Sequence, residues 1–95
     1  MSCWIRKTVG DDRENILLLG PDEWDLKTQV DLLADWLREN DGKLQGADGW
    51  IADIGFNVRI DASGGGPIIS SEIMELCLSN NVEIYLSEYG LEEKD

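Results

Sequence analysis

The stretch from Trp50 to Asp61 alternates apolar and polar residues along nearly its whole length. Its apolar members fall on one side of an extended chain and are Trp50, Ala52, Ile54, Phe56, Val58 and Ile60. Successive side chains of a β-strand point to opposite faces, so a period of two predicts a strand with one buried face and one wetter face. The stretch is longer than an ordinary strand, which predicts a position in or near the middle of a sheet.

Three shorter segments also read as strands. Residues 3–9 look like a first strand, with Cys3, Ile5 and Val9 on one face, and residues 15–19 form a short apolar run. Turn-forming residues at 10–13 lie between them, an arrangement typical of a hairpin. Residues 82–86 alternate apolar and polar side chains again and predict the last strand.

Two segments carry the periodicity of helices. The first begins near Asp22 or Asp25, either of which is a suitable N-cap, and ends at residues 40–42, which tolerate a left-handed backbone. Its apolar stripe recurs at steps of three and four residues and consists of Leu26, Val30, Leu33 and Leu37. The second helix is expected over residues 68–80, with Ser70 or Ser71 as its N-cap. Its apolar stripe consists of Ile69, Ile73, Leu76 and Cys77, with Met74 at the edge.

The order of these elements predicts the architecture. A strand–helix–strand crossover is right-handed, so residues 50–60 and 82–86 should be parallel neighbours. Each helix has one apolar stripe, and both should therefore cover the same face of the sheet. We expect residues 1–95 to form a single α+β domain, a two-layer sandwich of one mixed four-stranded sheet with two helices on one face.

The chain is strongly acidic, with 20 acidic and 8 basic residues and a formal net charge of −12. Nucleic acids and anionic membranes are bound through basic surfaces, so neither is an expected partner, whereas a basic protein is. The sequence begins without an apolar leader segment and has two cysteines without a CxxC pair, which favours a cytoplasmic location. No apolar run approaches the length that spans a bilayer.

The sequence carries no recognisable catalytic or cofactor motif. It contains no histidine, the commonest general base and metal ligand, so a Ser–His or Cys–His nucleophile pair is excluded. The acidic clusters at 11–12 and 22–25 lack the spacing of an EF-hand loop. The glycines Gly64–Gly66 are followed by Pro67 where a phosphate-binding loop would have lysine. We expect no enzymatic activity, no cofactor and no metal, although carboxylate chemistry stays open in principle.

Two surfaces are candidate partner-binding sites. The first is the acidic start of the first helix, which consists of Asp22, Glu23, Trp24 and Asp25. Aromatic residues beside polar groups are favoured at interface hot spots, although a tryptophan at the edge of the core gives the same pattern. The second is the polar face of the predicted sheet, with Asp53, Asn57, Arg59, Glu83 and Tyr85. An ordinary solvated sheet face is the alternative reading of this set.

A small, acidic, histidine-free α+β chain without a catalytic motif is similar to bacterial immunity proteins. These are the cytoplasmic partners of toxin domains delivered in contact-dependent growth inhibition. A local resemblance covers residues 24–89 and looks like a group of small bacterial domains of unknown function, seen in part near such toxin systems. The matching succession is Trp24, Leu33, Trp36-Leu37, Ile54-Gly55-Phe56, Gly66-Pro67-Ile68-Ile69-Ser70 and Tyr89.

The resemblance to immunity proteins implies a tight complex in which an acidic surface blocks a basic, often nucleic-acid-cleaving, toxin domain. No catalytic residues carry over from either group. Two alternatives remain open at the level of sequence: an acidic inhibitor that mimics nucleic acid, and a small ligand-binding domain that uses carboxylates or the glycine loop.

Overall fold

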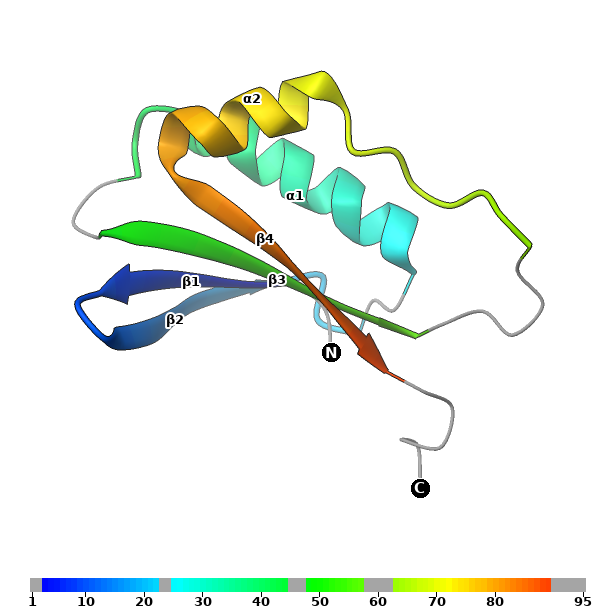
Figure 1. The fold of residues 1–95 in the computed structure, drawn as a ribbon, viewed down its shortest axis with the longest axis horizontal. Coiled ribbons are helices and arrows are strands. Elements are labelled where there is room, and N and C mark those ends of the chain that lie inside the picture. Colours follow the sequence, from blue (N-terminus) through cyan, green and yellow to red (C-terminus); the bar gives the residue numbers. More distant parts are fainter. Residues whose placement is uncertain (1–2, 23–24, 45–47, 58–62, 90–95) are drawn as a thin grey trace.

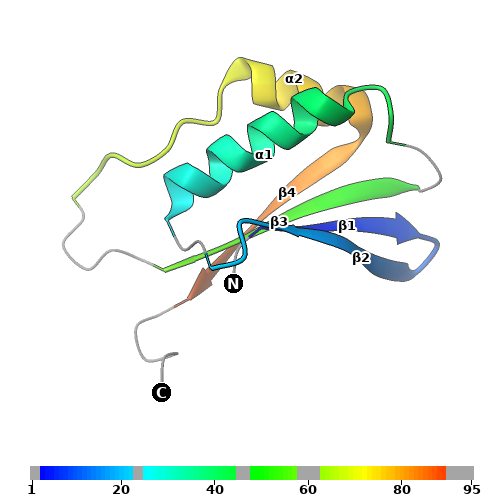
Figure 2. The same cartoon turned by 180° about the vertical axis from the view of Figure 1, so that it is seen from behind.

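In the described part of the chain, four strands and two helices form two layers, with both helices on one face of the sheet (Figures 1 and 2). The computed structural model describes residues 3–22, 25–44, 48–57 and 63–89. Its elements are β1 (Cys3–Val9), β2 (Asp12–Leu19), α1 (Leu26–Asn40), β3 (Gly49–Asn57), α2 (Ser71–Asn80) and β4 (Val82–Tyr89). The predicted α+β sandwich is therefore confirmed.

The sheet has the strand order β2-β1-β3-β4 and is mixed. β1 pairs antiparallel with both β2 and β3, and β3 pairs parallel with β4, as the crossover rule predicts. β1 and β2 form a hairpin in which Val9 faces Asp12, so β2 begins earlier than its apolar run. Gly10, in the turn between them, has a φ of 61°, a conformation that glycine adopts without steric cost.

Both helix starts are fixed by side-chain caps. The Asp25 carboxylate accepts hydrogen bonds from the backbone N–H of Thr28 at 3.1 Å and from its hydroxyl at 2.8 Å. The Ser70 hydroxyl accepts the N–H of Ile73 at 3.1 Å, and α2 begins at Ser71 instead of the expected residue 68. Because Ser70 is extended and serves as the cap, the apolar residues before it lie outside the helix.

Hydrogen bonds of Asn81, the C-cap of α2, join the end of α2 to the start of β3. Asn81 adopts a left-handed conformation with φ 56°, and its N–H donates to the carbonyls of Cys77 and Leu78. Its side-chain amide donates to the Asp48 carbonyl at 2.7 Å, and its own carbonyl accepts the Trp50 N–H at 3.0 Å.

The core lies between the helices and the sheet. Its buried members are Cys3, Ile5, Val30, Leu33, Ala34, Leu37, Ala52, Ile54, Ile73, Cys77 and Val82. Trp36 and Trp50 pack against its edge with ring centroids 6.4 Å apart. Ala52 and Ile54 are fully buried, which confirms the predicted core face of β3 at its centre.

The predicted faces of β3 are wrong in two respects. Phe56 is only half-buried and lies outside the core, because it follows Ile54, the last β3 residue that pairs with β1. On the opposite face, expected to be wetter, Ile51 is 3% exposed and Asp53 is 9% exposed. Residues 58–61 of the predicted long strand lie outside the described residues.

Candidate functional site

The sheet face without helices carries a polar network centred on Asp53. Arg6, from β1, places its Nη1 2.6 Å from Asp53 Oδ2. Ser87, from β4, donates its hydroxyl to Asp53 Oδ1 at 2.5 Å. Arg6 also donates from Nε to the side-chain oxygen of Asn15, on β2, at 2.8 Å. All four strands therefore contribute to one network, and both carboxylate oxygens of Asp53 are used inside it.

A second contact on this face joins the two edges of the sheet. Arg13 of β2 donates from Nη2 to the Tyr85 hydroxyl of β4 at 3.4 Å, and its guanidinium lies 5.6 Å from the centre of the Tyr85 ring. Because β1 and β3 lie between these strands, the contact passes over both of them. Long side chains thus extend across the face on which Ile51 is buried, which accounts for the burial of an isoleucine that no helix covers.

The structure brings together only part of the predicted sheet-face site. Asp53 and Tyr85 are register partners on β3 and β4, but their polar groups are already occupied by Arg6, Ser87 and Arg13. Glu83 is exposed and Asn57 is half-buried near the other end of the face. Arg59 lies outside the described residues. Asp53 is therefore bonded within the sheet face, and its assignment to a partner-binding surface stays a prediction.

The second predicted site, at the start of α1, is described in part. Asp22 is exposed, whereas Asp25 is the N-cap of α1 and has a structural role. Glu23 and Trp24 lie outside the described residues. The roles of this segment in binding stay predictions.

The two cysteines are poor nucleophiles. Burial, followed by the negative charge of Asp53, raises the pKa of the Cys3 thiol to about 12. Burial also raises the pKa of the Cys77 thiol. Because the thiolate is the reactive form, both side chains act as apolar core residues.

Neither a metal site nor a membrane span occurs in the described parts of the chain. Across residues 3–22, 25–44, 48–57 and 63–89, no three metal-ligating side chains come together. Neither α1 nor α2 combines the length and the apolar character that a helix needs to cross a membrane.

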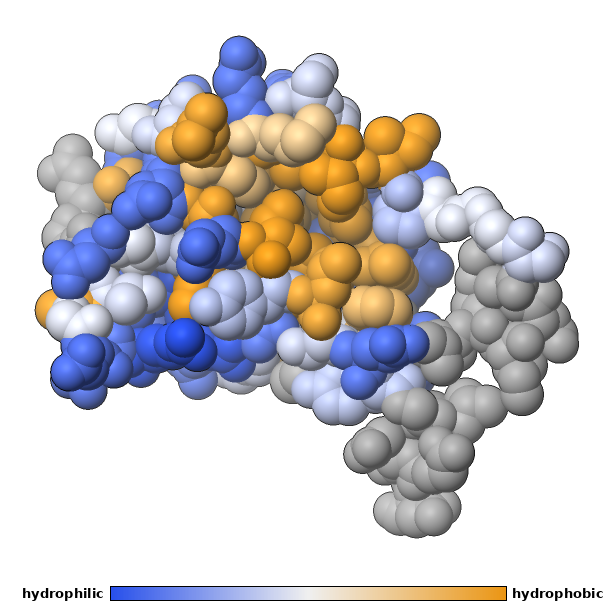
Figure 3. All heavy atoms as spheres, viewed as in Figure 1, coloured by the Kyte–Doolittle hydropathy of each residue, from blue (hydrophilic) through white to orange (hydrophobic). Residues whose placement is uncertain are grey.

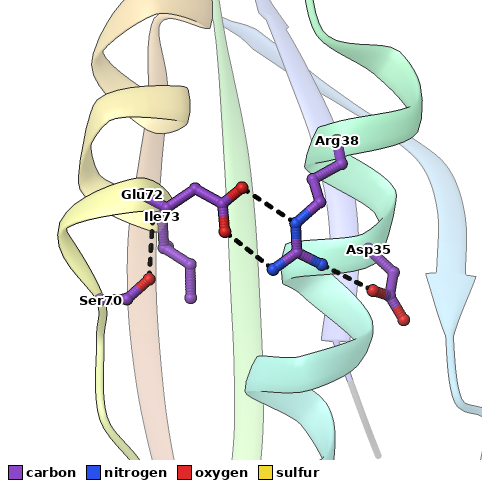
Figure 4. A network of polar contacts seen from close by, with 5 residues as sticks. All are labelled: Asp35, Arg38, Ser70, Glu72 and Ile73. Carbon is purple, nitrogen blue, oxygen red and sulfur yellow. Dashed lines mark hydrogen bonds and ion pairs between the residues drawn. The ribbon is translucent and has the colours of Figure 1, made fainter.

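An ion-pair network joins the two helices (Figure 4). Arg38 of α1 donates to both carboxylate oxygens of Glu72 on α2, at 3.1 and 2.8 Å, and to Asp35 at 2.8 Å. The hydrogen bonds between Arg38 and Glu72 lower the pKa of the Glu72 carboxyl and raise the pKa of the Arg38 guanidinium. Glu72 lies in the first turn of α2, so Arg38 fixes that turn against α1.

The side of the molecule formed by α2 and β4 exposes large apolar side chains, including Ile69 and Met74, which the sequence predicts in or beside the core. Figure 3 shows them gathered over the helix and the strand beneath it. We call the set the α2–β4 face, and its members are Ile68 (80% exposed), Ile69 (38%), Met74 (56%), Leu78 (84%) and Leu86 (60%). The sequence signal that points to it is Met74 and Leu78, four residues apart on a helix and outside the buried stripe.

Two described surfaces thus differ in character. On the sheet face without helices, the polar side chains bond to one another, whereas the α2–β4 face exposes large apolar side chains to solvent. Comparison with known proteins found no matching family model, curated protein or solved structure.

Proposed function

We propose that this chain is an immunity-type binding protein that neutralises a basic, nuclease-type bacterial toxin domain through an acidic surface. The observation that carries the proposal is the negative charge that remains after internal pairing. Acidic residues outnumber basic ones by 20 to 8. The basic residues Arg6, Lys7, Lys27 and Arg38 also form ion pairs with acids of the same chain. A partner therefore meets a surface with a large negative excess.

The proposal assigns binding, and no catalysis, to the chain. The polar groups that converge around Asp53 bond to one another instead of facing a substrate. The buried thiols of Cys3 and Cys77 are protonated at neutral pH. Free cysteines also suit the reducing cytoplasm, where an immunity protein has to meet an incoming toxin.

Charge of this sign supports fast association. Complementary charges steer two proteins together and suppress wrong partners, and salt weakens the steering. We therefore expect the complex with a basic toxin domain to form more slowly as salt is added, with a smaller change in its dissociation rate.

Co-expression with the toxin tests this function. We expect the partner to be a basic domain encoded beside this chain, and the test expresses that domain from an inducible promoter in cells with and without this chain. We expect growth arrest without this chain, growth with it, and co-purification of a stoichiometric complex. An adjacent domain that arrests growth equally in both strains, and that does not bind the purified chain by calorimetry, would contradict the proposal.

A further inference from the structure

We infer that the α2–β4 face is the docking site for an extended, basic segment of a partner protein, which adds a further strand to the outer edge of β4. The identity of the partner as a toxin rests on the proposed function; the location and chemistry of the site rest on the observations below.

Exposed apolar groups concentrate at this face. Of the large hydrophobic residues exposed in the described chain, only Val9 and Ile16 lie elsewhere, on the β1–β2 hairpin. Leu78 and Ile68 are 84% and 80% exposed, so neither side chain contributes appreciably to the core. A gathering of such groups on a small domain marks an interaction site, whereas single exposed residues need no explanation.

The backbone of β4 offers the second half of the site. β4 is an edge strand that pairs with β3 over residues 82–89, and no described strand pairs with its outer side. An edge strand turns N–H and C=O groups outward along its length, and extended peptides bind such edges by strand addition.

The helix layer leaves the far part of β4 uncovered. The side of β4 that faces the helices becomes more exposed along the strand, from Val82 (7%) through half-buried Ile84 to Leu86 (60%). α2 lies over the beginning of β4, and the end of the strand extends beyond the helices (Figure 1). The helix α2 has 10 residues, each adding about 1.5 Å, and is therefore shorter than β4, whose 8 residues each add about 3.3 Å. Leu86 is thus available to a strand lying beside β4.

The negative charge of residues 63–89 favours a basic partner segment at this face. Residues 63–89 contain four glutamates, Glu72, Glu75, Glu83 and Glu88, and no lysine or arginine. Glu72 is paired with Arg38, which leaves Glu75 on α2, Glu88 near the end of β4, and Glu83 on the open-sheet side of β4. We call these three glutamates the acidic rim. A second copy of this chain would bring equal negative charges together along the edge, which disfavours self-pairing. A segment that alternates apolar and basic residues matches both the apolar face and its rim.

A defined peptide tests the site independently of any toxin. The probe is a capped peptide of about eight alternating valine and lysine residues, the length of an ordinary strand, and its control carries glutamate in place of lysine. In amide NMR spectra of the whole ¹⁵N-labelled chain, we expect saturable shifts in β4 and α2 and slower exchange of outward β4 amides. The glutamate peptide should produce neither effect.

Three variants test which exposed apolar residues contribute to peptide binding. Leu86→Lys and Leu78→Lys should each weaken peptide binding by at least about tenfold, because each introduces a repelling charge into an apolar contact. Val9→Lys, a similarly exposed apolar position on the hairpin, should change it by less than about twofold. Thermal unfolding confirms that each variant is folded.

Several results would overturn the inference. These are the absence of saturable binding, shifts that map to the acidic segments near residues 11–14 or 22–25, and equal affinity of all three variants. Concentration-dependent shifts of β4 amides without peptide would assign the face to a second copy.

The toxin domain distinguishes the two proposals. If the toxin binds all three variants as tightly as wild type, it docks elsewhere, and this inference fails while the proposed function stands. If wild type binds no toxin but binds the lysine peptide along β4, the site stands and the proposed function fails.

Discussion

Arg6 Nη1 lies 2.6 Å from Asp53 Oδ2, although 47 residues separate them in the sequence. The pair lies on the sheet face without helices, where both side chains are largely buried. Asp53 also accepts a hydrogen bond from Ser87. This one carboxylate therefore ties β1 to β4 through β3, and its removal tests how much the open face contributes to stability.

We expect Asp53→Ala to lower the free energy of unfolding by about 1.5–3 kcal/mol, because it leaves Arg6 Nη1 and the Ser87 hydroxyl without their acceptor. Urea denaturation measures the change. Asp53→Asn is the matched control, since it keeps an acceptor oxygen but loses the charge, and it should cost less. An alanine variant as stable as wild type would show that the network contributes nothing net.

Gln29 provides a second test of a buried polar contact. Its side chain is fully buried, and its Nε2 donates to the Gly55 carbonyl at 2.7 Å, joining α1 to β3. Gln29→Leu should destabilise the fold by about 1–3 kcal/mol, because the buried carbonyl loses its donor. Gln29→Glu should cost more, since it buries a charge beside a carbonyl oxygen. Denaturation curves in which Gln29→Leu matches wild type would contradict this role.

Phe56 and Ile54 should differ in their contribution to the core. Ile54→Ala should cost about 2–5 kcal/mol, as expected for a fully buried residue. Phe56→Ala should cost only about 1–2 kcal/mol, because its ring is only partly buried and lies outside the core, so its truncation exposes less apolar area. Urea denaturation of the two variants under one set of conditions gives the comparison. Equal losses would place Phe56 in the core after all.

The Arg38–Glu72 pair should make stability depend on pH. The folded pKa of Glu72 lies below its ordinary value of 4.5, so its contribution is fully present above 4.5 and is lost as pH falls through the lower, folded value. Glu72→Gln cannot titrate. The difference in stability between wild type and Glu72→Gln should therefore shrink between about pH 7 and about pH 3. A difference that stays constant over this range would exclude the linkage.

The acidic segment before α1 should affect the rate of complex formation. Neutralising Asp22, Glu23 and Asp25 with Asn, Gln and Asn keeps a good N-cap at position 25, so the fold should persist. Weaker long-range attraction should slow association with the toxin domain at low salt more than at high salt, with dissociation unchanged. Stopped-flow kinetics measures both rates. Faster dissociation would mean that this segment contacts the partner directly.

The architecture was predictable because each element leaves a local signal. Alternation identified β3, the stripe through Leu33 and Leu37 identified α1, and the crossover rule gave the parallel pairing of β3 and β4. The helix caps at Asp25 and Ser70 were among the candidates that the sequence offered.

The surfaces were harder to predict because they depend on the pairing register of the strands and on the relative lengths of α2 and β4. Arg6 meets Asp53 because Trp4, two residues before Arg6 on the same face of β1, is the register partner of Asp53. Ile51 is buried on the open face because Arg13 and Tyr85 reach toward each other across two intervening strands. Leu86 continues the apolar alternation of β4 yet is exposed, because α2 covers only the beginning of that strand.

The hydrogen bonds of Asn81, which join the end of α2 to the start of β3, bear on the order of folding. The β1–β2 hairpin closes over a tight turn. In contrast, Trp50 of β3 meets Val82 of β4 only after the intervening chain, including α2, has been brought back to the sheet. Every later β3–β4 pair has the same sequence separation as Trp50 and Val82. Closing so long a loop carries a larger entropic cost and is slower than closing a hairpin. Asn81, bonded to Asp48 and Trp50, anchors the point at which this closure begins. We therefore expect the hairpin to be an early nucleus and the edge strand β4 to join last.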